Sequence, residues 1–176
     1  LAVIVAVGSV ATNLYIPALP DVRAHFGADV AHVQATFSVS LVTFAVGMLA
    51  WGPISDRYGR RRAVLAGMGI VVLGAALGLT AQSLPWLVAA RAVQAFGTSV
   101  GIAVSRAIIS DRFPTERMAS AIAQLAVVSV LANGLAPVLG GLLTESYGWR
   151  AVFAALIVFA LLPAFFAWRH LPETRD

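Results

Sequence analysis

The sequence Gly52-Pro-Ile-Ser-Asp-Arg-Tyr-Gly-Arg-Arg-Arg62 separates two apolar runs and decides the fold. Residues 30–55 before its charged part and residues 63–81 after it carry no charge. Each run is long enough to cross a hydrocarbon core of about 30 Å, which takes about 20 apolar residues as a helix. The charged stretch between them therefore predicts a tight turn at a membrane surface.

The remainder of the chain repeats this alternation. Its 176 residues are 60% hydrophobic and 11% charged, whereas a soluble domain carries about 25% charged residues. This composition excludes a soluble globule and a disordered chain, and the absence of cysteine excludes a disulfide scaffold. We expect an all-α, polytopic membrane protein in which residues 1–176 form one six-helix bundle, with the first break at Pro20-Asp21. The expected spans are about 1–19, 31–54, 63–82, 85–109, 118–143 and 151–168.

All twelve basic residues are arginines, and their distribution predicts an orientation. Nine lie at one set of helix ends, Arg23 and Arg150 lie at the other, and Arg91 lies within a run. Because cytoplasmic loops are enriched in basic residues, both termini and the nine-arginine side are expected in the cytoplasm. Arginines spread in this way favour membrane orientation over nucleic acid binding. The chain starts within an apolar run and without Met, so we expect it to be part of a longer protein.

An internal repeat relates the two halves of the chain. A shift of 89 positions aligns residues 52–61 with residues 141–150, with conservative matches at Ser55/Thr144 and Asp56/Glu145. Because the copies are separated by an odd number of spans, they face opposite sides of the membrane. The pattern predicts two inverted three-helix repeats, an arrangement that transporters use for alternating access. Four pairs are identical: Gly52/Gly141, Tyr58/Tyr147, Gly59/Gly148 and Arg61/Arg150.

Five motifs in order resemble the major facilitator superfamily, and within it the drug/proton antiporters of the Bcr/CflA multidrug-efflux branch. Residues 52–62 resemble the cytoplasmic signature between helices two and three, and residues 91–97 the motif of helix four. Residues 132–141 are similar to the antiporter motif of helix five, with alanine at two usual glycine positions. Residues 12–20 and 170–174 resemble the motifs of helix one and the end of helix six. The match covers six of the family's twelve helices, so the resemblance implies an N-terminal half without its second half.

The charged turn supplies candidates for a conformational latch. The glycines permit close backbone approach, and an Asp beside arginines at a helix terminus can form an ionic contact. The resemblance implies that such a latch closes the cytoplasmic side of the transporter. Marking of topology by basic residues is the alternative, which leaves the glycines and the Asp unexplained. The candidate residues are Gly52, Asp56, Arg57, Gly59, Arg60 and Arg61.

An arginine within a span predicts a substrate cavity. Burying Arg91 in hydrocarbon costs at least about 2.5 kcal/mol, which indicates a function unless the side chain reaches the nearby interface. Gln94 lies one turn further along the same helix face. Asn13 and Tyr15 in the first span and Gln34 in the second are suited to a mostly apolar pocket for drug-like molecules. The candidate cavity residues are therefore Asn13, Tyr15, Gln34, Arg91 and Gln94.

The fifth span carries a row of small residues and a proline. Ala136 and Gly140 lie on one helix face, next to Pro137 and Gly141, and this pattern favours close helix contact with a bend. The resemblance implies that this face seals the cavity against ion leak, and simple packing is the alternative.

The carboxylates raise a question about coupling. All eight lie outside the expected spans, whereas the resemblance implies an acidic residue where Asn13 stands. The proton carrier is then in the second half, or is Asp21 near the periplasmic mouth, or transport is uncoupled.

Other function classes find little support in the sequence. A six-span serine protease would need an activated nucleophile, but there is no Gly-x-Ser-Gly or His-Glu-x-x-His sequence, so we expect no enzyme, cofactor or metal. The alternatives to an efflux transporter are a standalone six-helix binding or assembly subunit and a non-functional transporter fragment. The expected partners are the lipid bilayer of the bacterial inner membrane, a small amphipathic substrate, protons, and a C-terminal half or a second copy.

Overall fold

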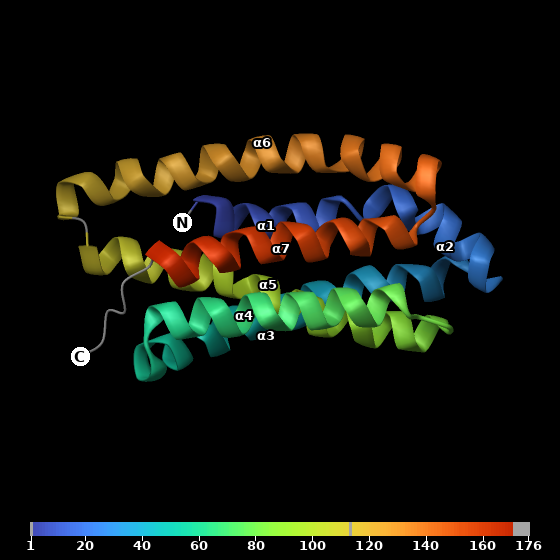
Figure 1. Cartoon of the computed structure of the whole chain (residues 1–176), viewed down its shortest axis with the longest axis horizontal. Coiled ribbons are helices and arrows are strands. Elements are labelled where there is room, and N and C mark those ends of the chain that lie inside the picture. The colour runs from blue at the N-terminus through green and yellow to red at the C-terminus, as the bar shows by residue number, and fades with distance from the viewer. Residues whose placement is uncertain (1, 113, 171–176) are drawn as a thin grey trace.

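The computed structural model describes residues 2–112 and 114–170, and every element in this part of the chain is helical. Figure 1 shows the helices side by side along the long axis of the molecule, with α6 along one edge. Among the described residues, six segments are long and apolar enough to span a bilayer and every regular element is a helix, which confirms the predicted all-α fold. The elements are α1 (Ala2–Asn13), η1 (Ile16–Ala18), α2 (Leu19–Phe26), α3 (Val30–Tyr58), α4 (Arg60–Leu79), α5 (Leu84–Arg112), α6 (Thr115–Tyr147) and α7 (Arg150–His170).

The first span has a 3-10 turn near its middle, and the turn expected at Pro20-Asp21 is wrong, because both residues lie within α2 and the turn before α3 falls at residues 27–29. Helix α1 ends at Asn13, a short 3-10 turn follows, and α2 carries the span to Phe26. Pro17 and Pro20 stand in the first turns of η1 and α2, where no helical partner awaits the missing N–H. The prolines therefore begin new helical segments, and the interruption falls near the middle of the span.

Helix α5 is the centre of the bundle, and glycines let its neighbours approach. A Cβ atom at Gly97 would lie 2.7 Å from the carbonyl oxygen of Gly67 on α4, and one at Gly101 would lie 2.6 Å from that of Ile4 on α1. In the apolar membrane-spanning part of α5, 61% is buried inside the bundle, whereas in that of α6 only 11% is buried. The small residues of α5 thus serve helix packing, and α6 packs with only part of its surface.

The internal repeat recurs as local structure. Gly59 and Gly148 cap α3 and α6 with φ of 95° and 78°, which favours glycine over other residues. Their N–H groups donate to the carbonyl oxygens of Ser55 and Thr144 at 3.1 and 2.8 Å. Positions that correspond in sequence thus have the same role at two helix ends.

The arginine that ends each copy ties α4 to α7. Arg61, at the start of α4, donates to the carbonyl oxygen of Trp168 near the end of α7. Arg150, at the start of α7, donates to the carbonyl oxygens of Leu79 and Ala81 at the end of α4, at 3.2 and 2.9 Å. These two antiparallel helices are therefore joined at both ends, which we call the Arg60 end and the Trp149 end of the bundle.

Candidate functional site

Arg91 is buried within α5, where only 2% of the residue is exposed. Its Nη1 atom donates to Oε1 of Gln94 at 2.7 Å and to the carbonyl oxygen of Ala11 at 3.3 Å. Ala11 belongs to the last turn of α1, where carbonyl groups lack helical partners. The discontinuity of the first span thus provides an acceptor for a charge in the apolar interior.

Tyr15 lies in the discontinuity and completes the cluster. Its ring centroid is 4.3 Å from Cζ of Arg91, a cation–π distance, and its hydroxyl donates to Oγ1 of Thr36 on α3 at 3.2 Å. The ring also packs against Phe153 of α7, with centroids 5.8 Å apart. The Arg91 cluster, which we define as Tyr15, Thr36, Arg91 and Gln94, therefore joins the first span to α3 and α5.

The cluster holds a positive charge and unused donors. Within the described residues, Nε of Arg91 and Nε2 of Gln94 have no hydrogen-bond partner, and no carboxylate is buried. A buried donor without an acceptor costs about 1–3 kcal/mol, and such groups call for an explanation such as a ligand or water. The cluster can accordingly donate hydrogen bonds to a neutral or anionic group.

The other two candidate cavity residues lie outside this cluster. Nδ2 of Asn13 donates to Oδ1 of Asn133 at 2.9 Å and so joins α1 to α6. Gln34 is exposed on α3, two residues from buried Thr36, and residues two apart on a helix point to different sides. Sequence reasoning missed Thr36 and Asn133, although Asn133 stands within the recognised motif at residues 132–141.

The small residues of α6 meet the discontinuity of the first span. Gly140 lies against the backbone of Leu14, so closely that a Cβ atom at Gly140 would clash with it. Ala136, one turn earlier, is also buried, and Pro137 is half-buried. A Cβ atom at Gly141 would meet nothing within 4 Å. Ala136 and Gly140 thus provide the close contact between α6 and the first span.

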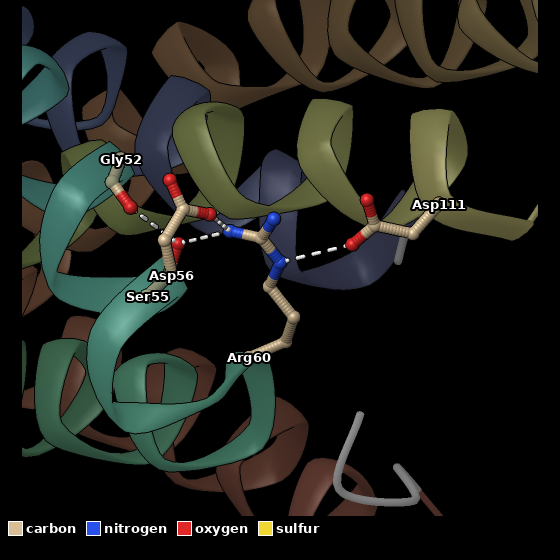
Figure 2. A network of polar contacts seen from close by, with 5 residues as sticks. All are labelled: Gly52, Ser55, Asp56, Arg60 and Asp111. Carbon is tan, nitrogen blue, oxygen red and sulfur yellow. Dashed lines mark hydrogen bonds and ion pairs between the residues drawn. The ribbon is translucent and has the colours of Figure 1, made fainter. Parts of the chain in front are cut away.

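A second polar group lies at the Arg60 end (Figure 2). Nη1 of Arg60 is 2.5 Å from both Oδ1 of Asp56 and Oγ of Ser55, and Nε of Arg60 is 3.1 Å from Oδ2 of Asp111. Ser55 donates to the carbonyl oxygen of Gly52 at 2.9 Å. Because these residues come from α3, α4 and α5, the Arg60 network fixes three helices at one point.

The structure separates the remaining latch candidates. Arg57 lies over the ring of Tyr58, 5.5 Å from its centroid, while Arg61 caps α7. Within this chain a Cβ atom at Gly52 would meet nothing within 4 Å, so the close approach expected at Gly52 stays a prediction. Gly59 is needed for its positive φ instead. Sequence reasoning missed Asp111, whose role depends on the packing of α5 beside α3.

Comparison with known proteins identifies the family. The sequence profile of the Major Facilitator Superfamily matches residues 1–176. The chain belongs to the Major Facilitator Superfamily.

Relatives within this superfamily carry names connected with drug resistance. Multidrug resistance protein D of Escherichia coli (strain K12) is 37% identical over 175 residues, covering 99% of this chain and 44% of that protein. The chloramphenicol resistance protein of Pseudomonas aeruginosa is 32% identical over 169 residues, covering 95% of this chain and 40% of that protein. The chain spans less than half the length of these two relatives.

A solved structure shares the fold. The crystal structure of a D-xylose-proton symporter superposes with a TM-score of 0.80 at 14% identity, covering 98% of this chain and 48% of that one. At this identity the likeness shows the fold alone, which is half of a Major Facilitator Superfamily transporter.

Proposed function

We propose that this chain is the N-terminal half of a transporter that exports small drug-like molecules by alternating access. The names of its relatives and their greater length support this role. In this proposal, six further helices or a second copy pack on the bundle, and rocking of one half against the other exposes a central cavity to each side in turn. The complete protein in this proposal is a transporter in the bacterial inner membrane and not an enzyme.

The observation that carries the proposal is the buried, positively charged Arg91 cluster at a break in a membrane-spanning helix. Transporters of this kind place substrate sites near the midplane, at discontinuous helices. An arginine kept inside an apolar bundle marks a functional site by default. In the proposed cavity, Arg91, Gln94 and Tyr15 bind substrate, and the Asn13–Asn133 pair borders it where α1 meets α6.

The Arg60 network is proposed as the cytoplasmic latch. Asp56 and Asp111 are exposed carboxylates, with 64% and 43% of their side chains accessible, so water can compete for Arg60 when a gap opens beside it. The gathering of arginines at this end supports a cytoplasmic location for it and for both termini.

Proton coupling is proposed to depend on groups outside the Arg91 cluster. None of the carboxylates in the described residues is buried, and a guanidinium stays protonated. The proposed carriers are a carboxylate in the second half or Asp21, which lies exposed on α2.

Efflux of a fluorescent amphipathic dye from cells that make the complete protein tests the proposal. Arg91→Ala and Asp56→Asn should each lower the efflux rate at least tenfold, whereas Arg91→Lys should retain part of it through its charge. Arg57→Ala is the matched control, because Arg57 contacts the ring of Tyr58 outside the network. Unchanged efflux in both loss-of-contact variants, at equal amounts in the membrane, would remove both assignments.

A further inference from the structure

The polar groups that are left unpaired in the Arg91 cluster are donors. Among the described residues, Nε of Arg91 and Nε2 of Gln94 are buried and have no hydrogen-bond partner. Oε1 of Gln94 already accepts from Arg91. Oγ1 of Thr36 accepts from the Tyr15 hydroxyl and donates to the carbonyl oxygen of Val33 at 2.7 Å. A ligand that completes the cluster therefore has to bring acceptors.

The cluster also carries a positive charge without a counter-ion in this chain. Every carboxylate in the part of the chain that the structure describes is exposed, and none of them forms an ion pair with Arg91. The guanidinium contacts neutral groups: Oε1 of Gln94 at 2.7 Å, the carbonyl oxygen of Ala11 at 3.3 Å, and the ring of Tyr15. These contacts stabilise the charge without neutralising it, so charge complementarity favours an anion.

The contact with Ala11 is the one that an anion can replace. At 3.3 Å it is longer than an ordinary N–H···O hydrogen bond of about 2.9 Å, and its acceptor is an uncharged carbonyl group in the last turn of α1. A carboxylate can bind a guanidinium through two parallel, shorter hydrogen bonds, one of which can use the free Nε atom. Because only 2% of Arg91 is exposed, the first span has to move away from α5 before a ligand enters. The inference therefore rests on the alternating access proposed above.

Aromatic side chains beside the charge indicate what kind of molecule carries the anion. The ring of Tyr15 packs against that of Phe153, and Phe153 packs against Trp149, with centroids 5.8 and 6.0 Å apart. Such rings offer an apolar, polarised surface to another aromatic ring. We propose that the site selects amphipathic aromatic anions, with the anionic oxygens on Arg91 and Gln94 and the ring system beside Tyr15. The same charge excludes organic cations from the site.

Binding of three matched probes to the complete protein in a neutral detergent at pH 7.5 tests this selectivity. The probes 2-naphthoate, 2-naphthamide and 2-naphthyltrimethylammonium share one ring system and differ in the charge of the polar group. Equilibrium dialysis gives the three dissociation constants. We expect 2-naphthoate to bind at least about tenfold more tightly than 2-naphthamide, as for one charge-assisted contact worth about 1.4 kcal/mol. The ammonium probe should bind more weakly than the amide.

Three substitutions assign the selectivity to the Arg91 guanidinium. Arg91→Gln should remove the preference for 2-naphthoate over 2-naphthamide. Arg91→Lys should keep a smaller preference, because lysine keeps the charge without the planar fork, and this variant also covers the case in which Arg91→Gln does not fold. Arg117→Gln is the matched control, since it removes the same charge from an exposed position near the start of α6 and should keep the full preference.

The outcomes that would overturn the proposal are distinct from those that bear on efflux. Equal affinity for the three probes, no binding of 2-naphthoate, tighter binding of the ammonium probe, or an undiminished preference in Arg91→Gln would each overturn it. A carboxylate of the second half that already neutralised Arg91 would give the first of these results. A transporter of neutral or cationic molecules would fail this binding test and still export the dye, so the efflux proposal is judged separately.

Discussion

Arg60 and Trp149 occupy the same position in the two copies of the repeat, but they make different kinds of contact. Each directly follows a glycine that caps a helix with positive φ. Arg60 is the first residue of α4, and Trp149 directly precedes α7. Arg60 is held by Asp56 and Asp111 in an ionic network. Trp149 is 95% buried among aromatic rings.

Around Trp149, aromatic rings take the place of the charged side chains that surround Arg60. Its ring centroid lies 6.0 Å from that of Phe153, 5.8 Å from Phe26 and 5.5 Å from His25, and Cζ of Arg150 lies 4.2 Å above the ring. The Trp149 end is thus closed by apolar packing and the Arg60 end by contacts that water can break. The backbone motif is shared, and the side chains give one end a buried aromatic cluster and the other a partly solvated ionic network.

The largest expected difference between the ends is in stability. Trp149→Ala should lower the free energy of unfolding by about 3–5 kcal/mol, because it removes a large buried ring and leaves a cavity. Arg60→Ala should lower it by about 1 kcal/mol, because its partners are partly solvated. Reversible denaturation in detergent micelles measures both, and equal losses would show that the ends are closed in the same way.

The capping arginines should behave alike despite their different neighbours. Arg61→Ala and Arg150→Ala each remove charged donors from carbonyl groups at a helix end and should cost about 1.5–3 kcal/mol. Helix α4 has 20 residues, so the two sites are about 30 Å apart and their effects should add. Denaturation of the single and double variants checks this, and strong non-additivity would contradict independent clamps.

The glycine caps should show a smaller, matched effect. Gly59→Ala and Gly148→Ala force a Cβ atom into a conformation of positive φ and extended ψ that is essentially restricted to glycine, and should each cost about 1–3 kcal/mol. Gly52→Ala and Gly141→Ala are the controls, since a Cβ atom at either site meets nothing within 4 Å and alanine favours a helix. The melting temperature should fall in Gly59→Ala and Gly148→Ala and should not fall in the two control variants.

The smallest expected effect concerns the first turns of α3 and α6, which are the second membrane-spanning helices of the two three-helix repeats. Asp29 caps α3 by accepting from the backbone N–H of His32 at 2.8 Å, and this bond, with the His32 ring, holds the pKa of Asp29 below its ordinary value. The cap is therefore complete above about pH 4 and is lost as the pH falls through the lowered pKa. Helix α6 follows Pro114, which provides no side-chain cap.

Hydrogen exchange followed by mass spectrometry checks this difference. After correction for the intrinsic pH dependence of exchange, acid should lower the protection of the first turn of α3 more than that of the first turn of α6, which contains Glu116 but has no side-chain cap. Asp29→Asn should remove the pH dependence, because an asparagine oxygen caps a helix without titrating. An equal acid response at both helix starts would contradict the assignment to Asp29.

Sequence reasoning reached the six spans and the repeat, but it reached the candidate site only in part. Arg91 and Gln94 were found because a charge inside an apolar run and a polar residue one turn away are visible in the sequence. Thr36 and Asp111 were missed because their roles depend on the neighbours that α3 and α5 acquire by packing. Gln34 was included on polarity alone, and its orientation on the helix separates it from the cluster.

The sequence by itself determined the spans and the repeat, since hydropathy over about 20 residues is a local property. The positive φ of Gly59 and Gly148 became evident only in the structure. The tertiary structure decided where the first span breaks, which acceptors surround Arg91, and that Arg60 meets Asp111 while Arg61 meets the end of α7. The physical reason is that these contacts join residues up to 107 positions apart. Their partners are selected by close helix packing at glycines and by the requirement that buried polar groups find hydrogen bonds.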